Sequence, residues 1–299
     1  RFTQENLMAK TVADVMKMVK ENEVKFVDFR FTDTRGKQQH TTVPVSHFDE
    51  DKFISGHAFD GSSIAGWKGI EASDMQLIPD PNSANIDPFF EETTLILTCD
   101  VIEPSDGKAY DRDPRSIAKR AEAYLKASGL GDTAYFGPEP EFFIFDGVRW
   151  STEPNHTFYE IEEYEAPWNT GSKLEGGNRG HRPTVKGGYF PVPPVDSTQD
   201  MRAEMSLILE SLGIPVEVFH HEVAGAGQNE IGTRFSTLVE RADWTMLQKY
   251  VIHNVANAYG KTATFMPKPY HGDNGSGMHV HSPCGKTART CSLATAMQA

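Results

Sequence analysis

The chain has 299 residues, 38% of them hydrophobic, and a formal net charge of −13, so it is long enough for two domains or one large one. The acidic balance argues against a nucleic-acid partner, which favours clustered lysine and arginine, and no apolar run approaches the ~18 to 20 residues of a membrane span. Three cysteines without CxxC spacing indicate neither a disulfide framework nor a zinc knuckle, and with no leader visible we expect a globular, cytoplasmic protein without a membrane or nucleic-acid partner.

The first residues of the chain predict a small α+β domain. Thr11 and Asp14 form a capping-box pattern ahead of an amphipathic helix that ends near Glu21. Residues 24–32 and 38–45 predict two strands joined by a turn that contains glycine. A helix followed by a hairpin is typical of such a domain.

A tight polar turn at residues 59–64 comes next, and by its residues alone it is only a loop. Residues 93–102 predict another strand, and the Pro-, Gly- and Asp-rich residues 104–113 mark the boundary of a second domain. That domain opens with a helix that has Asp113 as its N-cap and Gly129 just past its end.

The middle of the chain mixes loops and helices. Residues 150–182 are polar and rich in glycine, which predicts a long functional loop. Residues 185–195 contain three prolines and predict an extended, rigid segment. Helices are predicted for residues 197–212 and 241–259, each closed by a glycine.

Residues 137–145, Gly-Pro-Glu-Pro-Glu-Phe-Phe-Ile-Phe, predict the strand around which the chain is organised. Because strand side chains repeat with period two, Glu139 and Glu141 project from the same face, roughly 7 Å apart. The apolar run 142–145 suits a strand that is buried on both faces. The two carboxylates offer hard oxygen ligands to Mg²⁺ or Mn²⁺, and the alternative is a pair of solvated surface acids.

Further acids and two imidazoles belong to strands later in the chain. Glu222 and Glu230 lie near the two ends of one predicted hairpin and can converge. A glycine-rich loop at residues 272–277 leads into a short strand, where period two places His279 and His281 on one face. The loop matches neither a P-loop nor a dinucleotide fingerprint.

Together these residues predict an oxygen-rich site for two or more divalent ions. Such a site suits nucleotide phosphoryl transfer, in which the ions neutralise charge on the β- and γ-phosphates. It suits a binuclear hydrolase equally well. Composition and spacing leave both alternatives open.

Five stretches, taken in order, resemble bacterial-type (type I) glutamine synthetase. The likeness runs from about Thr11 to His281 and is carried by these motifs: Asp60-Gly61-Ser62-Ser63 with Gly66-Trp67, Gly137 to Phe143, Lys186 to Pro191, His220 to Glu230, and Lys261 to His279. Any one motif is moderate evidence, whereas all of them in order make the resemblance specific.

The resemblance implies an α+β fold with an N-terminal β-grasp domain, residues 1–108, and an incomplete catalytic domain, residues 109–281, built on a curved antiparallel sheet. It also implies a reaction. The family makes glutamine from glutamate, ATP and ammonia by transferring the γ-phosphoryl group of ATP to the glutamate side chain, from which ammonia then displaces phosphate. Divalent metal, Mg²⁺ or Mn²⁺, is the cofactor, and ATP is the co-substrate.

The motif matches also imply roles for individual residues. One metal ion would be held by Glu141, Glu222 and Glu230, and a second by Glu139 with His279. Glutamate would contact Glu141, Asn274, Gly275 and His279, and ATP would lie against Glu217 and His281. Ammonium would be bound by Asp60 with Ser63, Tyr189 and Glu222, and Asp60 would take its proton, since a carboxylate attracts a cation and accepts a proton.

In the family the Asp60 loop completes the active site of a neighbouring subunit within stacked rings. The resemblance therefore implies a homo-oligomer, a dodecamer in the family, and an inactive monomer.

After His281 the likeness ends abruptly. The family serine expected two residues later is Pro283 here, and residues 282–299 form an aberrant tail. The resemblance implies that the C-terminal part of the catalytic domain, with its arginines for glutamate and phosphate, is missing, and our hypothesis is a frame error or a premature end. We therefore expect little or no synthetase activity from the chain as it stands. The alternatives are a catalytically dead structural or interaction fragment and a ligase that joins another amine, such as a polyamine, to glutamate.

Overall fold

The computed structural model describes residues 9–285. It divides into two compact units, with the division between Thr133 and Ala134. Each unit combines helices with one main sheet, which confirms the α+β class. None of the helices between residues 9 and 285 combines the length and the apolar character that a membrane crossing requires.

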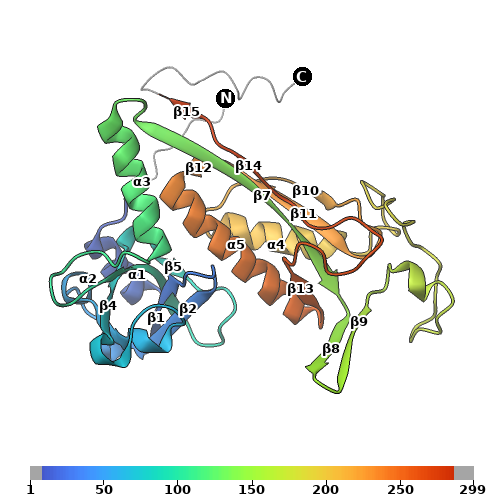
Figure 1. Cartoon of the computed structure of the whole chain (residues 1–299), viewed down its shortest axis with the longest axis horizontal. Coiled ribbons are helices and arrows are strands. Elements are labelled where there is room, and N and C mark those ends of the chain that lie inside the picture. The colour runs from blue at the N-terminus through green and yellow to red at the C-terminus, as the bar shows by residue number, and fades with distance from the viewer. Residues whose placement is uncertain (1–8, 286–299) are drawn as a thin grey trace. The chain divides into compact units, whose positions relative to one another are not determined.

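The first unit is built on a mixed sheet of six strands within the described residues (Figure 1). Its central strands β1 and β6 run parallel, and the other pairings are antiparallel, in the order β2-β1-β6-β4-β3 with β5 beside β6. The strands are β1 (Phe26–Thr32), β2 (Gln38–Pro44), β3 (His57–Asp60), β4 (Asp74–Pro79), β5 (Asn85–Ile86) and β6 (Thr94–Ile102).

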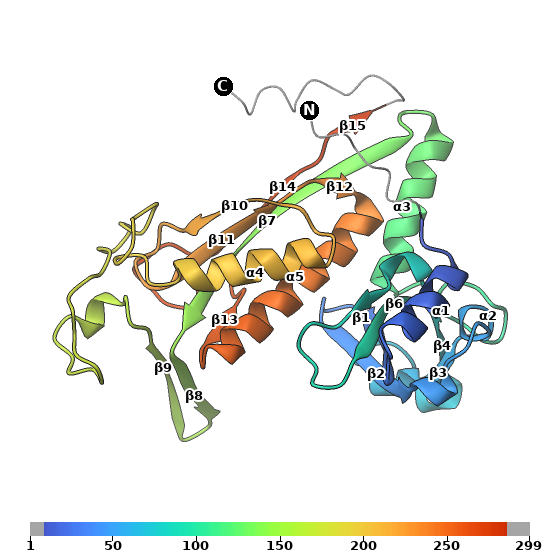
Figure 2. The same ribbon diagram turned by 180° about the vertical axis from the view of Figure 1, so that it is seen from behind.

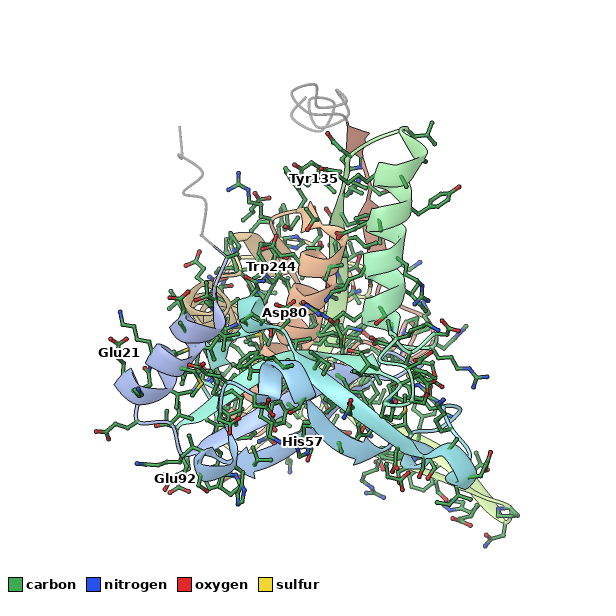
Figure 3. The ribbon with its side chains drawn as sticks, turned by 90° about the vertical axis from the view of Figure 1, so that its left-hand side faces the viewer. Glu21, His57, Asp80, Glu92, Tyr135 and Trp244 are labelled. Atoms are coloured by element: carbon green, nitrogen blue, oxygen red, sulfur yellow. The ribbon has the colours of Figure 1, made fainter. Side chains whose placement is uncertain are left out.

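Helix α1 (Val12–Glu21) covers this sheet (Figure 2). Thr11 and Asp14 form the expected capping box, and the apolar face of the helix buries Val15 and Val19 in one core with strand residues such as Phe29. The ring of His57, labelled in Figure 3 at the start of β3, stacks on Phe29 with 5.1 Å between ring centroids. Short-range capping and long-range apolar burial therefore select the same helix.

The first unit also contains α2 (Lys52–Ser55) and α3 (Pro114–Ser128). The Asp113 side chain accepts hydrogen bonds from the backbone N–H groups of Arg115 and Ser116 at the start of α3, and Gly129 ends the helix in the left-handed conformation. Both helix limits match the expectation, because each depends on local chemistry alone.

The second unit is organised around β7 (Thr133–Phe145), the long strand in Figure 1. Strands β11, β12, β13 and β14 pair antiparallel with successive parts of β7, β15 pairs with it too, and β10 lies beyond β11. The strands are β10 (Val216–His221), β11 (Gln228–Thr233), β12 (Ser236–Thr237), β13 (Thr262–Thr264), β14 (Met278–His281) and β15 (Cys284–Gly285). Tyr135, labelled in Figure 3, lies near one end of β7. Its ring packs edge-on against the ring of Phe235.

Two helices, α4 (Gln199–Ser211) and α5 (Leu238–Ala258), lie side by side along this sheet (Figures 1 and 2). They bury Met205 and Leu209 from α4 together with Val251 and Val255 from α5. Both helices were expected, although α5 begins three residues earlier than its sequence pattern indicates. Isolated 3-10 turns occur at Val45–His47, Gly61–Ser63, Ile70–Ala72, Pro81–Ser83 and Pro167–Asn169.

The expectation of a long loop over residues 150–182 is wrong for its first part. Residues 147–162 form a hairpin of β8 (Gly147–Glu153) and β9 (His156–Glu162), in which Trp150 pairs with Tyr159. Large aromatic side chains directly opposite each other stabilise an antiparallel pair, and this outweighs the polar character of the segment. Residues 163–182 contain no strand or α-helix, as expected.

Candidate metal centre

Glu139 and Glu141 lie on one face of β7. Their side chains are half-buried, while Pro138 before them and Pro140 between them are buried, which is the alternation that period two predicts. The next four residues, 142–145, are all buried. The two acids therefore mark the place where a fully buried strand reaches the surface of its sheet.

Strand pairing places further polar groups beside these acids. Glu230 on β11 lies directly opposite Glu141, and His220 on β10 lies opposite Glu230. Directly paired residues of antiparallel strands project to the same face, with Cβ atoms about 4.5 to 5.5 Å apart. Three adjacent strands thus carry a row of ionisable side chains across the sheet.

Glu222, just after β10, completes a compact group with His220 and Glu230. Each residue offers one ligand atom, and these three atoms lie within 4.8 Å of one another. His220 Nε2 is 3.5 Å from Glu230 Oε2, and His220 Nδ1 is 3.9 Å from Glu222 Oε1. His220 was not among the expected ligands, yet the sequence carried a signal for it, since His220 and Glu222 are two residues apart on a strand.

The carboxylates of this site are partly buried and repel one another. Burial raises the pKa of Glu230 to about 7, and the charges of Glu222, Glu141 and Glu139 add to the shift. Burial also raises the pKa of Glu141, with a further contribution from Glu222. Among residues 9–285, no lysine or arginine forms an ion pair with any of these four acids. A divalent cation would relieve this repulsion, and a set of hard oxygen donors fits Mg²⁺ or Mn²⁺.

Glu141 is held in place by neutral groups. Its Oε2 accepts hydrogen bonds from Gln228 Nε2 at 2.9 Å and from the Gly277 N–H at 3.0 Å. A Cβ at position 277 would lie 3.1 Å from Glu141 Oε1, so glycine allows the backbone to approach. These bonds orient the carboxylate without neutralising it.

The two histidines of β14 are exposed beside Glu139. His279 lies opposite Glu139 in the strand register, but His281 makes the ion-pair contact, with its Nε2 3.5 Å from Glu139 Oε1. His279 instead lies near Glu141, whose pKa it helps to lower. The separate roles expected for His279 and His281 stay predictions.

The loop that carries Asn274 and Gly275 approaches the same acids. Gln228 Nε2, which binds Glu141, also donates to the Gly275 carbonyl oxygen at 2.9 Å. Buried Asp273 accepts a hydrogen bond from the Asn274 N–H at 2.8 Å. The structure thus brings this loop to Glu141, and the contact expected between Asn274, Gly275 and glutamate stays a prediction.

Tyr189 and Glu217 differ in their relation to this group. The Tyr189 ring lies edge-on to His220, with centroids 5.6 Å apart, so Tyr189 borders the cluster. Its segment, residues 185–195, is not extended as expected, because Lys186 and Phe190 take left-handed φ angles of 57° and 58°. Glu217 is exposed on β10 and takes part in none of the contacts above.

Asp60 and Ser63 belong to the first unit. Asp60 accepts hydrogen bonds from the Ser62 hydroxyl at 2.6 Å, the Ser62 N–H at 2.8 Å and the Ser63 hydroxyl at 3.3 Å. The bonds from Ser62 dominate, and together they hold the pKa of Asp60 below its ordinary value. The Asp60 side chain is therefore an exposed, ionised carboxylate at neutral pH.

Two family models match the chain. "Glutamine synthetase, beta-Grasp domain" matches residues 23–104, and "Glutamine synthetase, catalytic domain" matches residues 111–289. These matches confirm the expected β-grasp and catalytic domains. The boundary after residue 108 stays a prediction, since it falls between the two matches while the compact units divide after Thr133.

The catalytic-domain match extends eight residues beyond His281, where the tail was expected to begin. Within that tail, β15 pairs with β7, and the Tyr135 N–H donates to the Pro283 carbonyl oxygen at 2.9 Å. The rest of the expected tail, residues 286–299, lies outside the described residues.

Several curated relatives match most of the chain. A 3-hydroxylaminophenol mutase of Cupriavidus pinatubonensis is 76% identical over 279 residues, which cover 93% of this chain and 59% of that protein. A glutamine synthetase of Vibrio cholerae is 60% identical over 276 residues, which cover 92% of this chain and 59% of that protein. The chain therefore spans less than two thirds of the length of either relative.

A solved structure of a glutamine synthetase has the same fold as this chain. The glutamine synthetase of Plasmodium falciparum superimposes with a TM-score of 0.86 at 27% identity, over 94% of this chain and 55% of that chain.

The raised pKa of Glu230 gives a pH-dependent prediction. Because its folded pKa of about 7 exceeds the ordinary 4.5, Glu230 destabilises the metal-free fold little below pH 4.5 and fully above pH 7. We expect Glu230→Gln to raise the free energy of unfolding by about 1 to 3 kcal/mol at pH 8 and to have little effect at pH 4.5. Urea unfolding at both pH values, in the presence of a chelator, measures the difference. Glu210→Gln, on the exposed side of α4, is the control, and an effect of Glu230→Gln that did not change with pH would contradict the assignment.

Proposed function

The chain belongs to the glutamine synthetase family, and we propose that its site serves the ATP-dependent ligation of ammonia to glutamate through a γ-glutamyl phosphate. The observation that carries this proposal is the convergence of Glu141, Glu222 and Glu230 from neighbouring strands within the part of the chain that matches the catalytic-domain model. These acids share one half-buried face and carry charges that no described lysine or arginine balances.

The proposed metal ligands follow from that arrangement. Glu141, Glu222 and Glu230 would hold one Mg²⁺ or Mn²⁺ ion. Glu222 and Glu230 form a compact group with His220, and Glu141 joins them through its pairing with Glu230. Glu139 and His279, which face each other across β7 and β14, would hold a second. Bound there, the ions would supply the positive charge that a transferring phosphoryl group requires.

The chain's own side chains would bind and orient the substrates. Asp60, kept ionised by its hydrogen bonds from Ser62 and Ser63, would attract ammonium and accept its proton at the site of a neighbouring copy of the chain. Tyr189 and Glu222 of that neighbouring copy would be the further contacts. Glutamate would contact Asn274 and Gly275 as well as Glu141 and His279. ATP would lie against Glu217 and His281.

A second candidate function rests on a specific observation. The relative with 76% identity is named a 3-hydroxylaminophenol mutase, so isomerisation of a hydroxylaminophenol is a reaction to test on this chain. The two candidates make different demands, because a ligase consumes ATP and a mutase interconverts isomers.

Metal affinity tests the ligand set directly. We expect Glu222→Gln and Glu141→Gln each to weaken Mn²⁺ binding at pH 8 by about tenfold or more, which corresponds to 1.4 kcal/mol, because each removes a charged oxygen ligand. Isothermal titration calorimetry on the 299-residue chain measures the affinity. Glu210→Gln is again the matched control, and equal affinities for all four proteins would reject the proposed ligands.

Turnover separates the two candidate functions. We expect the chain to bind Mg-ATP but to release phosphate slowly, because loss of one donor to developing charge costs about 10²-fold or more and residues 9–285 place no lysine or arginine in an ion pair with the acids. The measurement is phosphate release with glutamate and ammonia, together and separately. In a parallel assay without ATP, chromatography measures the conversion of 3-hydroxylaminophenol to an isomer.

Each outcome of these assays supports one of three functions. Phosphate release that requires both glutamate and ammonia supports the ligase. Isomerisation without ATP supports the mutase. Metal and nucleotide binding without either reaction supports a binding fragment and contradicts an enzymatic role for this chain.

We also propose that the chain forms a homo-oligomer, with a closed ring as the expected arrangement. An apolar cavity of about 710 Å³ lies between the β8–β9 hairpin and residues 262–271, with Phe145, Trp150, Tyr159 and Tyr270 among its lining residues. Trp150 and Tyr159 are 68% and 61% exposed. Exposed apolar surface of this kind marks association sites.

Light scattering tests the self-association. We expect Trp150→Ser to lower the average mass of the wild-type oligomer, because it removes apolar surface that a second copy would bury. Leu207→Ser is the matched control, since Leu207 on α4 is also 68% exposed. A monomeric wild type, or equal masses for both variants, would contradict this role of the hairpin.

A further inference from the structure

We propose that His221, held by Glu165, is a positioning residue that fixes the Tyr189 loop, residues 186–190, against the backbone of Glu222. This inference deepens the proposed function and rests on it for the roles of Tyr189 and Glu222. The two residues carry none of the expected site roles, and both are fully buried.

Both ring nitrogens of His221 have partners. Nδ1 lies 2.8 Å from the Gly188 carbonyl oxygen and 2.7 Å from the Glu222 carbonyl oxygen. A carbonyl oxygen only accepts hydrogen bonds, so Nδ1 carries a proton and donates to both. The ring thus connects the backbone of the Tyr189 loop to the backbone of a proposed metal ligand.

The other side of the ring is anchored in the fold. His221 Nε2 is 2.8 Å from Glu165 Oε2, and Glu165 Oε1 accepts a hydrogen bond from the Ser197 N–H at 2.6 Å. Ser197 directly precedes Thr198, the N-cap residue of α4. The buried Glu165 carboxylate therefore connects the imidazole to the backbone just before helix α4. This contact orients the ring independently of the loop that it holds.

The Tyr189 loop needs such an anchor. Lys186 and Phe190 have φ angles of 57° and 58°, which are unfavourable for residues with a side chain. The loop is held by backbone bonds from Gly188 N to Val223 O at 3.0 Å and from Phe190 N to His221 O at 3.4 Å. Contacts with the segment 221–225 thus maintain a conformation that the loop disfavours by itself.

Gly188 shows how close the two segments are. A Cβ at this position would lie 2.5 Å from the Glu222 carbonyl oxygen and 2.8 Å from His221 Cε1. Such distances leave no room for a side chain. The His221 contact therefore acts together with the Gly188–Val223 backbone bond to fix the separation between the loop and Glu222, and with it the place of the Tyr189 ring beside His220.

Three variants separate positioning from plain core packing. His221→Leu removes both N–H contacts and keeps an apolar side chain. His221→Asn restores one N–H donor near the two carbonyl groups without the link to Glu165. His57→Leu is the control, since it removes a half-buried stacked imidazole from the first unit.

Hydrogen exchange and metal binding are the measurements, both on the full chain. We expect His221→Leu to speed amide exchange of residues 186–190 and to weaken Mn²⁺ binding, each by about tenfold, which is 1.4 kcal/mol. Exchange in β11 should stay at the wild-type rate. His221→Asn should recover most of the loop protection, and His57→Leu should leave both quantities unchanged.

Wild-type loop exchange in His221→Leu, or no recovery in His221→Asn, would overturn the proposal. Should His221→Leu fail to fold, Gly188→Ala forces the loop away from the His221 ring and from the Glu222 and Ala224 carbonyl oxygens, which its Cβ would meet at 2.5 to 2.8 Å. It is expected to speed loop exchange and weaken Mn²⁺ binding while His221 is kept, and an unchanged loop would again overturn the inference. If the wild-type chain bound no Mn²⁺, the proposed function would fail, whereas the exchange measurement would still decide whether His221 holds the loop.

Discussion

Repulsion among carboxylates that a sheet holds in fixed register is the constraint on which this site depends. Glu141 and Glu230 face each other because β7 and β11 are paired, and further strands pair along β7. The acids therefore relieve their repulsion only by binding a proton or a cation. Burial, together with the charges of Glu222, Glu141 and Glu139, raises the pKa of Glu230 to about 7, so the metal-free site takes up a proton more readily than an ordinary carboxyl group does.

The surrounding polar groups keep this charge unbalanced. Gln228 binds Glu141 through a neutral amide, whereas two buried acids farther out have ion-pair partners, Asp196 with Arg202 and Glu165 with His221. A buried polar group without a partner is costly, so these outer groups are satisfied within the fold. The charge left for a ligand is thus concentrated on the face of the sheet that carries Glu139 and Glu141.

Helix capping and strand periodicity predicted the parts of the fold that depend only on residues close together in the sequence. The capping box of α1, the ends of α3 and the same-face placement of Glu139 and Glu141 each follow from a few adjacent positions. The β8–β9 hairpin was missed because its stability comes from aromatic pairing across the turn, which polar composition hides. Reading the segment by alternation rather than by polarity would have indicated strands.

Pairing between strands that are far apart in the sequence determines how the site residues come together. Glu222 and Glu230 were expected to converge because they share one hairpin. Their approach to Glu141 depends instead on the register between β11 and β7, in which Glu230 pairs with Glu141 although the two residues are 89 positions apart in the sequence. Glu165 and His221 are separated by 56 residues, and no local pattern connects them. His220 lay within reach of the period-two rule, because it stands two residues before Glu222 in the same predicted hairpin.

The same geometry bears on the choice of ion. Three carboxylates alone would suit Mg²⁺, which requires oxygen ligands in near-ideal octahedral geometry. Here His220 stands within 4.8 Å of the ligand atoms of Glu222 and Glu230, and His279 faces Glu139 across the strand pair. Imidazole nitrogen is a softer donor, and in the order of divalent affinities it favours transition metals. In the proposed site, a direct bond from His220 to the ion would therefore separate a mixed donor set from the purely oxygen donor set that suits Mg²⁺ and Mn²⁺ alike.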